Sequence, residues 1–213
     1  MNKVSAYMLV KDEAWFIKHA LGSVLACVDD VLIVDFASVD GTKDIAEEYA
    51  RCYSHVRVEH AVQEGPRHSA AWLEGHYRRY CVDKLEHDWV FVIDGDEYYD
   101  GHPDLLRTFN KPLSLPTINI GPGGTLITKV GETPWYPDLH VRLYDRRTHW
   151  WSEVKHGGVT SATGTELGSQ TDATLWHYHA LGKEPRRTAT LTNPQAFNLV
   201  PLSRRIPVSE CDL

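Results

Sequence analysis

The segment WVFVIDGDEYYD, residues 89–100, gives the strongest indication of the fold. Its first five residues are apolar and either aromatic or β-branched, which is typical of a strand buried on both faces of a sheet. The acidic residues Asp94, Asp96 and Glu97 follow, and Gly95 separates the first two. We therefore predict a core strand that ends in an acidic turn, where the glycine allows a ligand to approach the backbone closely.

Strand-like and helix-like segments alternate between the N-terminus and this turn. Short apolar runs predict strands at residues 4–10, 31–35, 56–58 and 89–94. Apolar residues at helical spacing predict helices that follow Glu13, that follow Thr42 as the N-cap, and that cover residues 68–85. Such alternation predicts an α/β fold with a Rossmann-like, mostly parallel sheet flanked by helices.

The pattern changes after residue 106, where prolines and glycines interrupt short apolar runs. The runs TLITKV (125–130), HVRLYD (140–145) and WHYHAL (176–181) predict strands of a mixed or antiparallel C-terminal extension. We expect THWW (148–151) to be a loop and residues 186–191 to begin a helix. Because no linker interrupts the chain, we predict one domain over residues 1–213, with halves 1–106 and 107–213.

Composition and charge narrow the classes of protein. Of the 213 residues 42% are hydrophobic and 24% charged, which excludes a disordered or fibrous chain. The sequence has no apolar run of about 18 residues and has charges near its start, so we expect a soluble cytoplasmic protein without a transmembrane segment. The four cysteines lack CxxC spacing and are expected to be small buried thiols, not a zinc site or disulfides.

The two halves differ in charge. Residues 1–106 contain 20 acidic and 10 basic side chains, whereas residues 107–213 contain 9 acidic and 12 basic ones. The acidic half suits a metal held by carboxylates, and the basic half suits an anionic partner. The arginines that could serve this purpose are Arg142, Arg146, Arg147, Arg186 and Arg187.

Acidic residues end three of the predicted strands. In an open parallel sheet ligands bind at the carboxyl ends of the strands. The acids at these ends are Asp12, Glu13, Asp35, Asp94 and Asp96. Converging carboxylates repel one another, which favours hydrogen-bond donors or a bound cation. A hard ion such as Mn²⁺ or Mg²⁺, bridging carboxylates and a diphosphate, fits this arrangement.

Three segments in this order resemble the family 2 glycosyltransferases of the GT-A fold, especially small bacterial and phage members. They are MLVKDEAWF (8–16), VLIVDFASVDGT (31–42) and WVFVIDGDEYYD (89–100). The resemblance covers about residues 4–100 well. It extends more loosely to HVRLYDRR, WWSEVKHGG and LWHYHALG in the second half.

The resemblance implies roles for individual residues. It implies that Asp35 contacts the base or ribose of a nucleotide-sugar donor and that Asp12 and Glu13 border the same pocket. Asp94 reaches the ribose or the metal, and Asp96 coordinates the metal. Many family members have a second acid directly after the residue that matches Asp35, whereas this chain has Phe36, which leaves the choice of base open.

A histidine late in the chain often supplies a further metal or diphosphate ligand in enzymes of this fold. His177 and His179 alternate, so both face the same way if they lie in a strand, and either imidazole could serve. An inverting transfer also needs a general base for the acceptor hydroxyl. The candidates are Asp138, Glu153 and His156. Glu153 is favoured because Trp150 and Trp151 precede it and could bind a sugar or raise its pKa.

The sequence therefore predicts a metal-dependent inverting glycosyltransferase with a UDP-sugar as the expected donor. The default acceptor is a hydroxyl of a cell-surface glycan precursor. A modified nucleic-acid base is an alternative acceptor, which the net charge of −7 opposes. A nucleotidyltransferase would need a glycine-rich basic loop after the first strand, and KDEAWF is neither. A catalytically silent nucleotide-sugar-binding module is the remaining alternative.

Overall fold

A computed structural model describes most of the chain. The described residues are 1–62, 74–121, 125–129, 138–152, 158–164, 169–170, 173–178, 197–200 and 207. Among them, eleven strands form one sheet and two more form a separate hairpin. The α/β class predicted from the sequence is confirmed.

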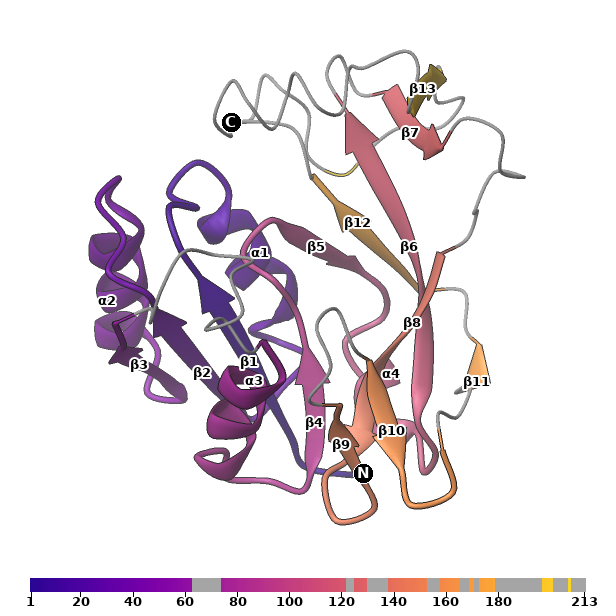
Figure 1. Cartoon of the computed structure of the whole chain (residues 1–213). Helices are drawn as coiled ribbons and strands as arrows, with labels where there is room; N and C mark the ends of the chain where they lie inside the picture. Colours follow the sequence, from indigo (N-terminus) through magenta and orange to yellow (C-terminus); the bar gives the residue numbers. More distant parts are fainter. Residues whose placement is uncertain are drawn as a thin grey trace.

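The first half of the chain builds the parallel part of the sheet, drawn in indigo to magenta in Figure 1. Its strands are β1 (Val4–Val10), β2 (Asp30–Asp35), β3 (Val56–His60) and β4 (Trp89–Val92). They lie in the order β3-β2-β1-β4, and all three pairings are parallel. The four predicted strands are therefore present, with ends shifted by at most a few residues.

Side chains of successive strand residues enter two different cores. Val4, Ala6 and Met8 of β1 pack in one hydrophobic cluster, whereas Tyr7 packs in the other. This alternation is the period of two that a strand imposes. The strand is apolar apart from Ser5 because helices cover both of its faces.

Helices α1 (Ile17–Val24) and α2 (Thr42–Cys52) contribute to the first cluster. The buried residues of α1 are Ile17, Ala20, Leu21 and Val24, which follow the helical spacing. Helix α3 (Glu74–Asp83) contributes Cys81 to the second cluster on the other face. Residues 68–73, which begin the helix predicted over residues 68–85, lie outside the described residues.

The prediction of Thr42 as an N-cap is wrong. Gly41 occupies that position with φ 100°, and Thr42 is the first helical residue. The Thr42 hydroxyl instead accepts a 2.7 Å hydrogen bond from the Glu13 backbone N–H and donates one of 2.6 Å to Asp40. It therefore connects the start of α2 to the segment that follows β1.

The chain after β4 adds the mixed extension, drawn from magenta through orange to yellow in Figure 1. Its first elements are β5 (Glu97–Asp100), α4 (Leu105–Thr108), β6 (Leu113–Gly121), β7 (Thr125–Lys129) and β8 (Asp138–Asp145). The remaining strands are β9 (His149–Trp151), β10 (Val159–Ser161), β11 (Ser169–Gln170), β12 (Thr174–His177) and β13 (Phe197–Val200). Strand β8 is antiparallel to both β4 and β6, and so continues the parallel sheet into the extension.

The predicted loop THWW is wrong, because its last three residues form β9 and pair with β10. Trp151 is buried, whereas Trp150 is 43% exposed, and this alternation is that of a strand with one covered face. The sequence reading also missed β6, which contains Pro116. Strand β11 pairs with β6 before Pro116, and β12 pairs with β6 after it. Pro116 is therefore opposite neither strand.

Strand β12 joins two elements that are distant in sequence. It is antiparallel to β5, with His177 opposite Glu97, and parallel to β6, with His177 opposite Asn119. Residues that are opposite one another in neighbouring strands share a face of the sheet. Glu97, His177 and Asn119 therefore form a row across three strands.

Cys27 and Cys81 are buried and unpaired thiols, as predicted, whereas Cys52 is exposed. Burial raises the pKa of Cys27 to about 11. Cys211 lies outside the described residues, as does the predicted helix at 186–191. No helix in the described part of the chain is both long and apolar enough to span a membrane.

Candidate active site

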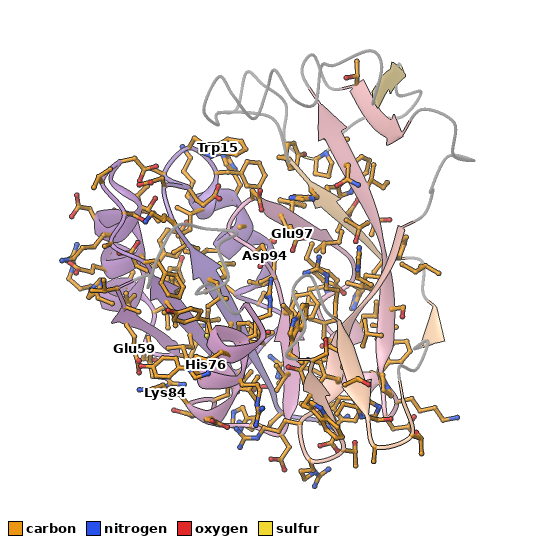
Figure 2. All side chains as sticks on the ribbon, viewed as in Figure 1. Trp15, Glu59, His76, Lys84, Asp94 and Glu97 are labelled. Carbon is orange, nitrogen blue, oxygen red and sulfur yellow. The ribbon has the colours of Figure 1, made fainter. Side chains whose placement is uncertain are left out.

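The carboxyl ends of β1, β2 and β4 lie at one edge of the sheet. Val10 at the end of β1 is opposite Asp35 at the end of β2, and Tyr7 of β1 is opposite Val92 at the end of β4. The acidic segments that follow these strands therefore converge, as predicted. Figure 2 shows Asp94 and Glu97 close together at this edge, near the junction with the extension.

Gly95 permits tight packing between two of these segments. A Cβ atom at this position would lie 2.9 Å from Val10 Cγ1 and 3.3 Å from two side-chain atoms of Glu13. The space that the sequence analysis assigned to a ligand is therefore filled by the protein. A side chain at residue 95 would push the acidic turn away from the end of β1.

Two arginines surround Asp94. Arg78 on α3 donates to both carboxylate oxygens, at 3.1 and 3.3 Å, and Arg142 on β8 lies 3.8 Å from one of them. Burial alone raises the pKa of Asp94, but the charges of Arg78 and Arg142 outweigh it and hold this pKa below its usual value. Asp94 is therefore a carboxylate with guanidinium partners supplied by the protein.

Glu97 is a buried carboxylate that shapes the acidic turn. Its Oε2 accepts a 2.8 Å hydrogen bond from the Asp94 backbone N–H, and its Oε1 accepts one of 2.6 Å from Arg142. Burial raises the pKa of Glu97, and the positive charge of Arg142 only partly opposes this effect. Because only 1% of the Glu97 side chain is exposed, Arg142 is essential to keep a charge there.

We expect Arg142→Met to destabilise the protein by about 3–5 kcal/mol, since it leaves an uncompensated buried charge at Glu97. Urea unfolding measures the loss of unfolding free energy. Arg147→Met is the matched control, because Arg147 also contacts a carboxylate, Asp145, at 2.6 Å but is 63% exposed. The control should unfold close to the parent. Equal destabilisation by the two substitutions would contradict the importance of burial at Arg142.

Asp96 faces a histidine from the second half of the chain, His177. Its Oδ2 lies 3.2 Å from Nε2 of His177, and its backbone carbonyl accepts a 2.9 Å hydrogen bond from the Tyr178 N–H. On the other side of the ring, Nδ1 of His177 lies 2.8 Å from Oδ1 of Asn119. The Asp96 side chain is 7% exposed and that of His177 is 21% exposed, so the pair is largely buried.

Asp35 is a buried acid at the end of β2. Its Oδ2 accepts a 3.3 Å hydrogen bond from the Ser38 N–H and lies 3.6 Å from Nδ1 of His60. Its Oδ1 is buried and has no hydrogen-bond partner among the described residues. A buried carboxylate oxygen without a donor is costly, so a hydrogen bond from an N–H or O–H group to this oxygen would be favourable.

Asp12 organises the loop that follows Asp35. Asp12 has φ 53°, a left-handed conformation that aspartate tolerates better than most residues. Its backbone N–H donates to Ser38 Oγ at 2.9 Å, and its carboxylate accepts from the Val39 N–H at 2.8 Å. Glu13 is 5% exposed and packs against the acidic turn at Gly95. Both acids predicted to border a nucleotide pocket therefore lie beside Asp35 or Asp94.

Arg78, which the fold places beside Asp94, is a site residue that the sequence pattern does not predict. The Trp151 ring of β9 stacks on its guanidinium at 4.3 Å, and the Tyr7 ring lies 5.9 Å away. Such stacking is favourable for arginine, particularly away from water. Nothing in the helical pattern distinguishes Arg78 from the adjacent Arg79, because the partners of Arg78 come from other elements.

The β9–β10 hairpin holds the ends of the segment that contains two predicted catalytic residues. The Ser152 N–H donates to the Gly158 carbonyl at 2.9 Å, which joins the residues on either side of 153–157. Since Trp151 contacts Arg78, the hairpin is attached next to Asp94. Glu153 and His156 belong to the segment between these anchored ends and lie outside the described residues.

A family model for glycosyl transferase family 2 matches residues 5–165 of the chain. The chain belongs to this family. The resemblance predicted from the sequence is thus confirmed, and the matched residues include the acidic strand ends and the β9–β10 hairpin.

Curated relatives match a shorter part of this family 2 chain. An uncharacterized glycosyltransferase of Rickettsia felis is 35% identical over 98 residues, which are 46% of this chain and 30% of the relative. A TPR repeat-containing protein of Synechococcus elongatus is 29% identical over 117 residues, 54% of this chain and 26% of the relative. The chain spans less than a third of the length of either relative.

Solved structures also show similarity to the family 2 chain. S. aureus TarS in complex with UDP-GlcNAc is 22% identical with a TM-score of 0.44, and the match covers 57% of this chain and 36% of that one. A mannosyltransferase of Pyrobaculum calidifontis, in complex with GDP-Man and Mn²⁺, is 17% identical with a TM-score of 0.40. That match covers 56% of this chain and 36% of the other.

Asp138 and His179 are the remaining predicted site residues of the family 2 chain. The Asp138 backbone begins β8 opposite Thr117, but the Asp138 side chain lies outside the described residues. His179 also lies outside them. Within the described part of the chain, no group of three or more His, Cys, Asp or Glu side chains could hold a metal ion. The predicted roles of these residues stay predictions.

The described arginines of the basic half have carboxylate partners. Arg142 contacts Glu97, as shown above, Arg146 contacts Asp88 at 3.3 Å, and Arg147 contacts Asp145. Asp145 is opposite Trp89, the first residue of β4, so the last two arginines lie at the opposite end of that strand from the acidic turn. Arg186 and Arg187 lie outside the described residues.

Proposed function

We propose that this chain transfers a sugar from a nucleoside-diphosphate donor to an acceptor hydroxyl, with inversion and with a divalent cation. The observation that carries the proposal is the pairing of Asp96 with His177, which the fold brings to 3.2 Å across 81 residues of sequence. The pair lies at the carboxyl edge of a parallel sheet, where ligands of such folds bind. Membership of glycosyl transferase family 2 gives the reaction class.

The residues at this edge fit Mn²⁺ or Mg²⁺. A carboxylate oxygen such as Asp96 Oδ2 suits Mn²⁺ and Mg²⁺, and the imidazole nitrogen beside it, His177 Nε2, is of the commonest type of metal ligand in proteins. Ions of this kind are commonly bound by one or two carboxylates together with substrate phosphates and water. A small set of protein ligands is therefore what a cation shared with a donor diphosphate needs. Asp94, which binds Arg78, serves to position the turn and to face the ribose.

Asp35 supports the nucleotide part of the donor site. Its buried Oδ1 can accept from a base N–H or a ribose hydroxyl, and the loop at residues 38–40 is fixed beside it by Asp12. UDP is the first nucleotide to test. A carboxylate accepts hydrogen bonds equally from uracil N–H and from guanine N–H, so GDP belongs in the same comparison.

The chemistry divides between the two halves of the chain. When bound, the cation would stabilise the negative charge of the departing nucleoside diphosphate. Asp35 and Asp96 orient the donor, and a base takes the proton from the acceptor hydroxyl as it attacks the anomeric carbon. Glu153 is our candidate for that base, because its segment begins directly after the Trp151 contact with Arg78.

We propose a hydroxyl of a cell-surface glycan precursor as the acceptor. Arg146 and Arg147 both bind carboxylates of the chain itself, so neither adds a free positive charge for a polyanion. Binding to nucleic acid draws its affinity from such charges. This pairing favours the glycan over the nucleic-acid base.

A thermal-shift comparison of UDP, GDP and ADP, each with and without Mn²⁺, tests the proposal. A nucleotide at about 100 times its Kd adds about 2.7 kcal/mol of stability. For a chain of this size the expected rise in Tm is roughly 5–10 °C. The shift should require Mn²⁺ and should depend on the base. Turnover of the matching nucleotide sugar on a hydroxyl acceptor then tests transfer, and a protein that binds no nucleotide under any condition refutes the proposal.

Asp35→Ala should weaken binding of the selected nucleotide by roughly 10- to 100-fold, because a hydrogen bond to a charged group contributes about 1.5–3 kcal/mol. Isothermal titration calorimetry measures the change. The affinity for Mn²⁺ alone should be that of the parent, since Asp35 is not a predicted metal ligand. Unchanged nucleotide affinity in a folded Asp35→Ala protein would remove Asp35 from the donor site.

A further inference from the structure

Asn119 is a polar residue of β6 to which neither the sequence nor the family comparison gives a role. It lies directly opposite His177 in the parallel β6–β12 pairing. Its Oδ1 is 2.8 Å from Nδ1 of His177, while Nε2 of the same ring is 3.2 Å from Asp96. Asn119, His177 and Asp96 therefore form a chain of three polar groups that ends in the acidic turn.

The acceptor and donor properties of these groups restrict where the protons lie. A neutral imidazole has one N–H donor and one acceptor nitrogen, and the side-chain oxygen of asparagine only accepts. The contact with Asn119 Oδ1 therefore places the proton of His177 on Nδ1. Nε2 then directs its lone pair toward Asp96, whose ionised carboxylate also only accepts. In the neutral ring these two acceptors face one another, and either a second ring proton or a cation between them makes the contact favourable.

We propose that Asn119 is a positioning residue for the cation site: it holds His177 in the Nδ1–H tautomer, so that Nε2 faces Asp96 and binds a divalent cation together with it. This inference rests on the proposed function and deepens it. Partners of a metal-binding histidine on its far side fix the tautomer and ring orientation, and their loss commonly reduces metal affinity by about 10- to 100-fold.

The test measures Mn²⁺ affinity of the full chain in the absence of any nucleotide, by electron paramagnetic resonance of free Mn²⁺. Asn119→Leu keeps the approximate shape but removes the acceptor, and we expect affinity to fall by about 10- to 100-fold. Asn119→Asp keeps an acceptor oxygen and should retain the parent's affinity or exceed it. Thr117→Val is the control, because Thr117 lies two residues earlier on the same face of β6 and is opposite Leu175.

A second measurement reads the tautomer directly. With Cd²⁺ as a diamagnetic substitute, ¹⁵N NMR of the parent should show a proton on Nδ1 of His177 and none on Nε2. This result does not depend on whether Asn119→Leu folds. A proton on Nε2 in the Cd²⁺-loaded protein would overturn the proposal.

The affinities separate failure of this inference from failure of the proposed function. If the parent binds Mn²⁺ and Asn119→Leu binds it equally well, the cation site stands and the role of Asn119 is refuted. If Asn119→Asp loses as much affinity as Asn119→Leu, the acceptor is not what matters, and the role is again refuted. A parent with no measurable affinity for Mn²⁺ alone refutes the role of Asn119, whereas the proposed function fails only if Mn²⁺ with nucleotide also gives no binding.

Discussion

Asp96→Asn should abolish Mn²⁺-dependent nucleotide binding and reduce sugar transfer by at least about 10³-fold. The substitution keeps the size of the side chain but removes the charge that faces His177. A bound cation contributes several kcal/mol of transition-state stabilisation, and each 1.36 kcal/mol is a factor of about ten in rate. Calorimetry with the nucleotide selected by thermal shift, with and without Mn²⁺, measures binding, and release of nucleoside diphosphate measures transfer.

Asp88→Asn provides the matched control for this experiment. Asp88 immediately precedes β4, at the end opposite the acidic turn, and its carboxylate contacts Arg146. The control enzyme should bind and turn over like the parent. Undiminished Mn²⁺-dependent binding in a folded Asp96→Asn protein would show that the cation site lies elsewhere.

Glu153→Gln should reduce transfer by roughly 10²- to 10⁴-fold, which is the usual contribution of a general base. Binding of nucleotide and of Mn²⁺ should stay near the parent's values, because Asp35, Asp96 and His177 remain intact. The glutamine has the same shape but cannot take a proton. Initial rates with one acceptor, measured beside both binding constants, separate the loss of chemistry from the loss of binding.

Asp138→Asn and His156→Ala complete the comparison, because each replaces a rival candidate for the base. We expect both to retain more activity than Glu153→Gln. If Glu153→Gln keeps most of its rate while one of the other two is disabled, the disabled position supplies the base. A pH–rate profile of that enzyme then shows whether the ascending limb has been lost.

Local pattern was sufficient to predict the parallel half of the fold. The sequence predicts the strand at residues 4–10 with its observed ends, because a strand with both faces buried is a nearly continuous apolar run, here interrupted only by Ser5. The helix after Glu13 followed from the spacing of Ile17, Leu21 and Val24. In this half each element is encoded by residues that are close in sequence.

The missed elements and contacts depend on pairing over long distances. The strand over residues 149–151 is stabilised by β10 and by the contact of Trp151 with Arg78, which no local pattern reveals. The neutralisation of the acidic turn also depends on residues that are distant in sequence. The sequence indicated that converging carboxylates need donors or a cation, and the structure shows that Arg78 and Arg142 neutralise Asp94. No local pattern predicts the contact between Asn119 and His177, because the two residues are 58 positions apart in the sequence.

The position of β12 also has a consequence for the order in which the protein assembles. Pairing β12 with β5 and β6 requires closing a long loop, and pairings of that kind form late in folding. The strands that present Asp35 and Asp94 precede β12 in the chain and are therefore synthesised before it. During synthesis we therefore expect Asp35, Asp94 and Asp96 to be in place before His177 arrives. Insertion of β12 is then a late assembly step, and it brings His177 to Asp96.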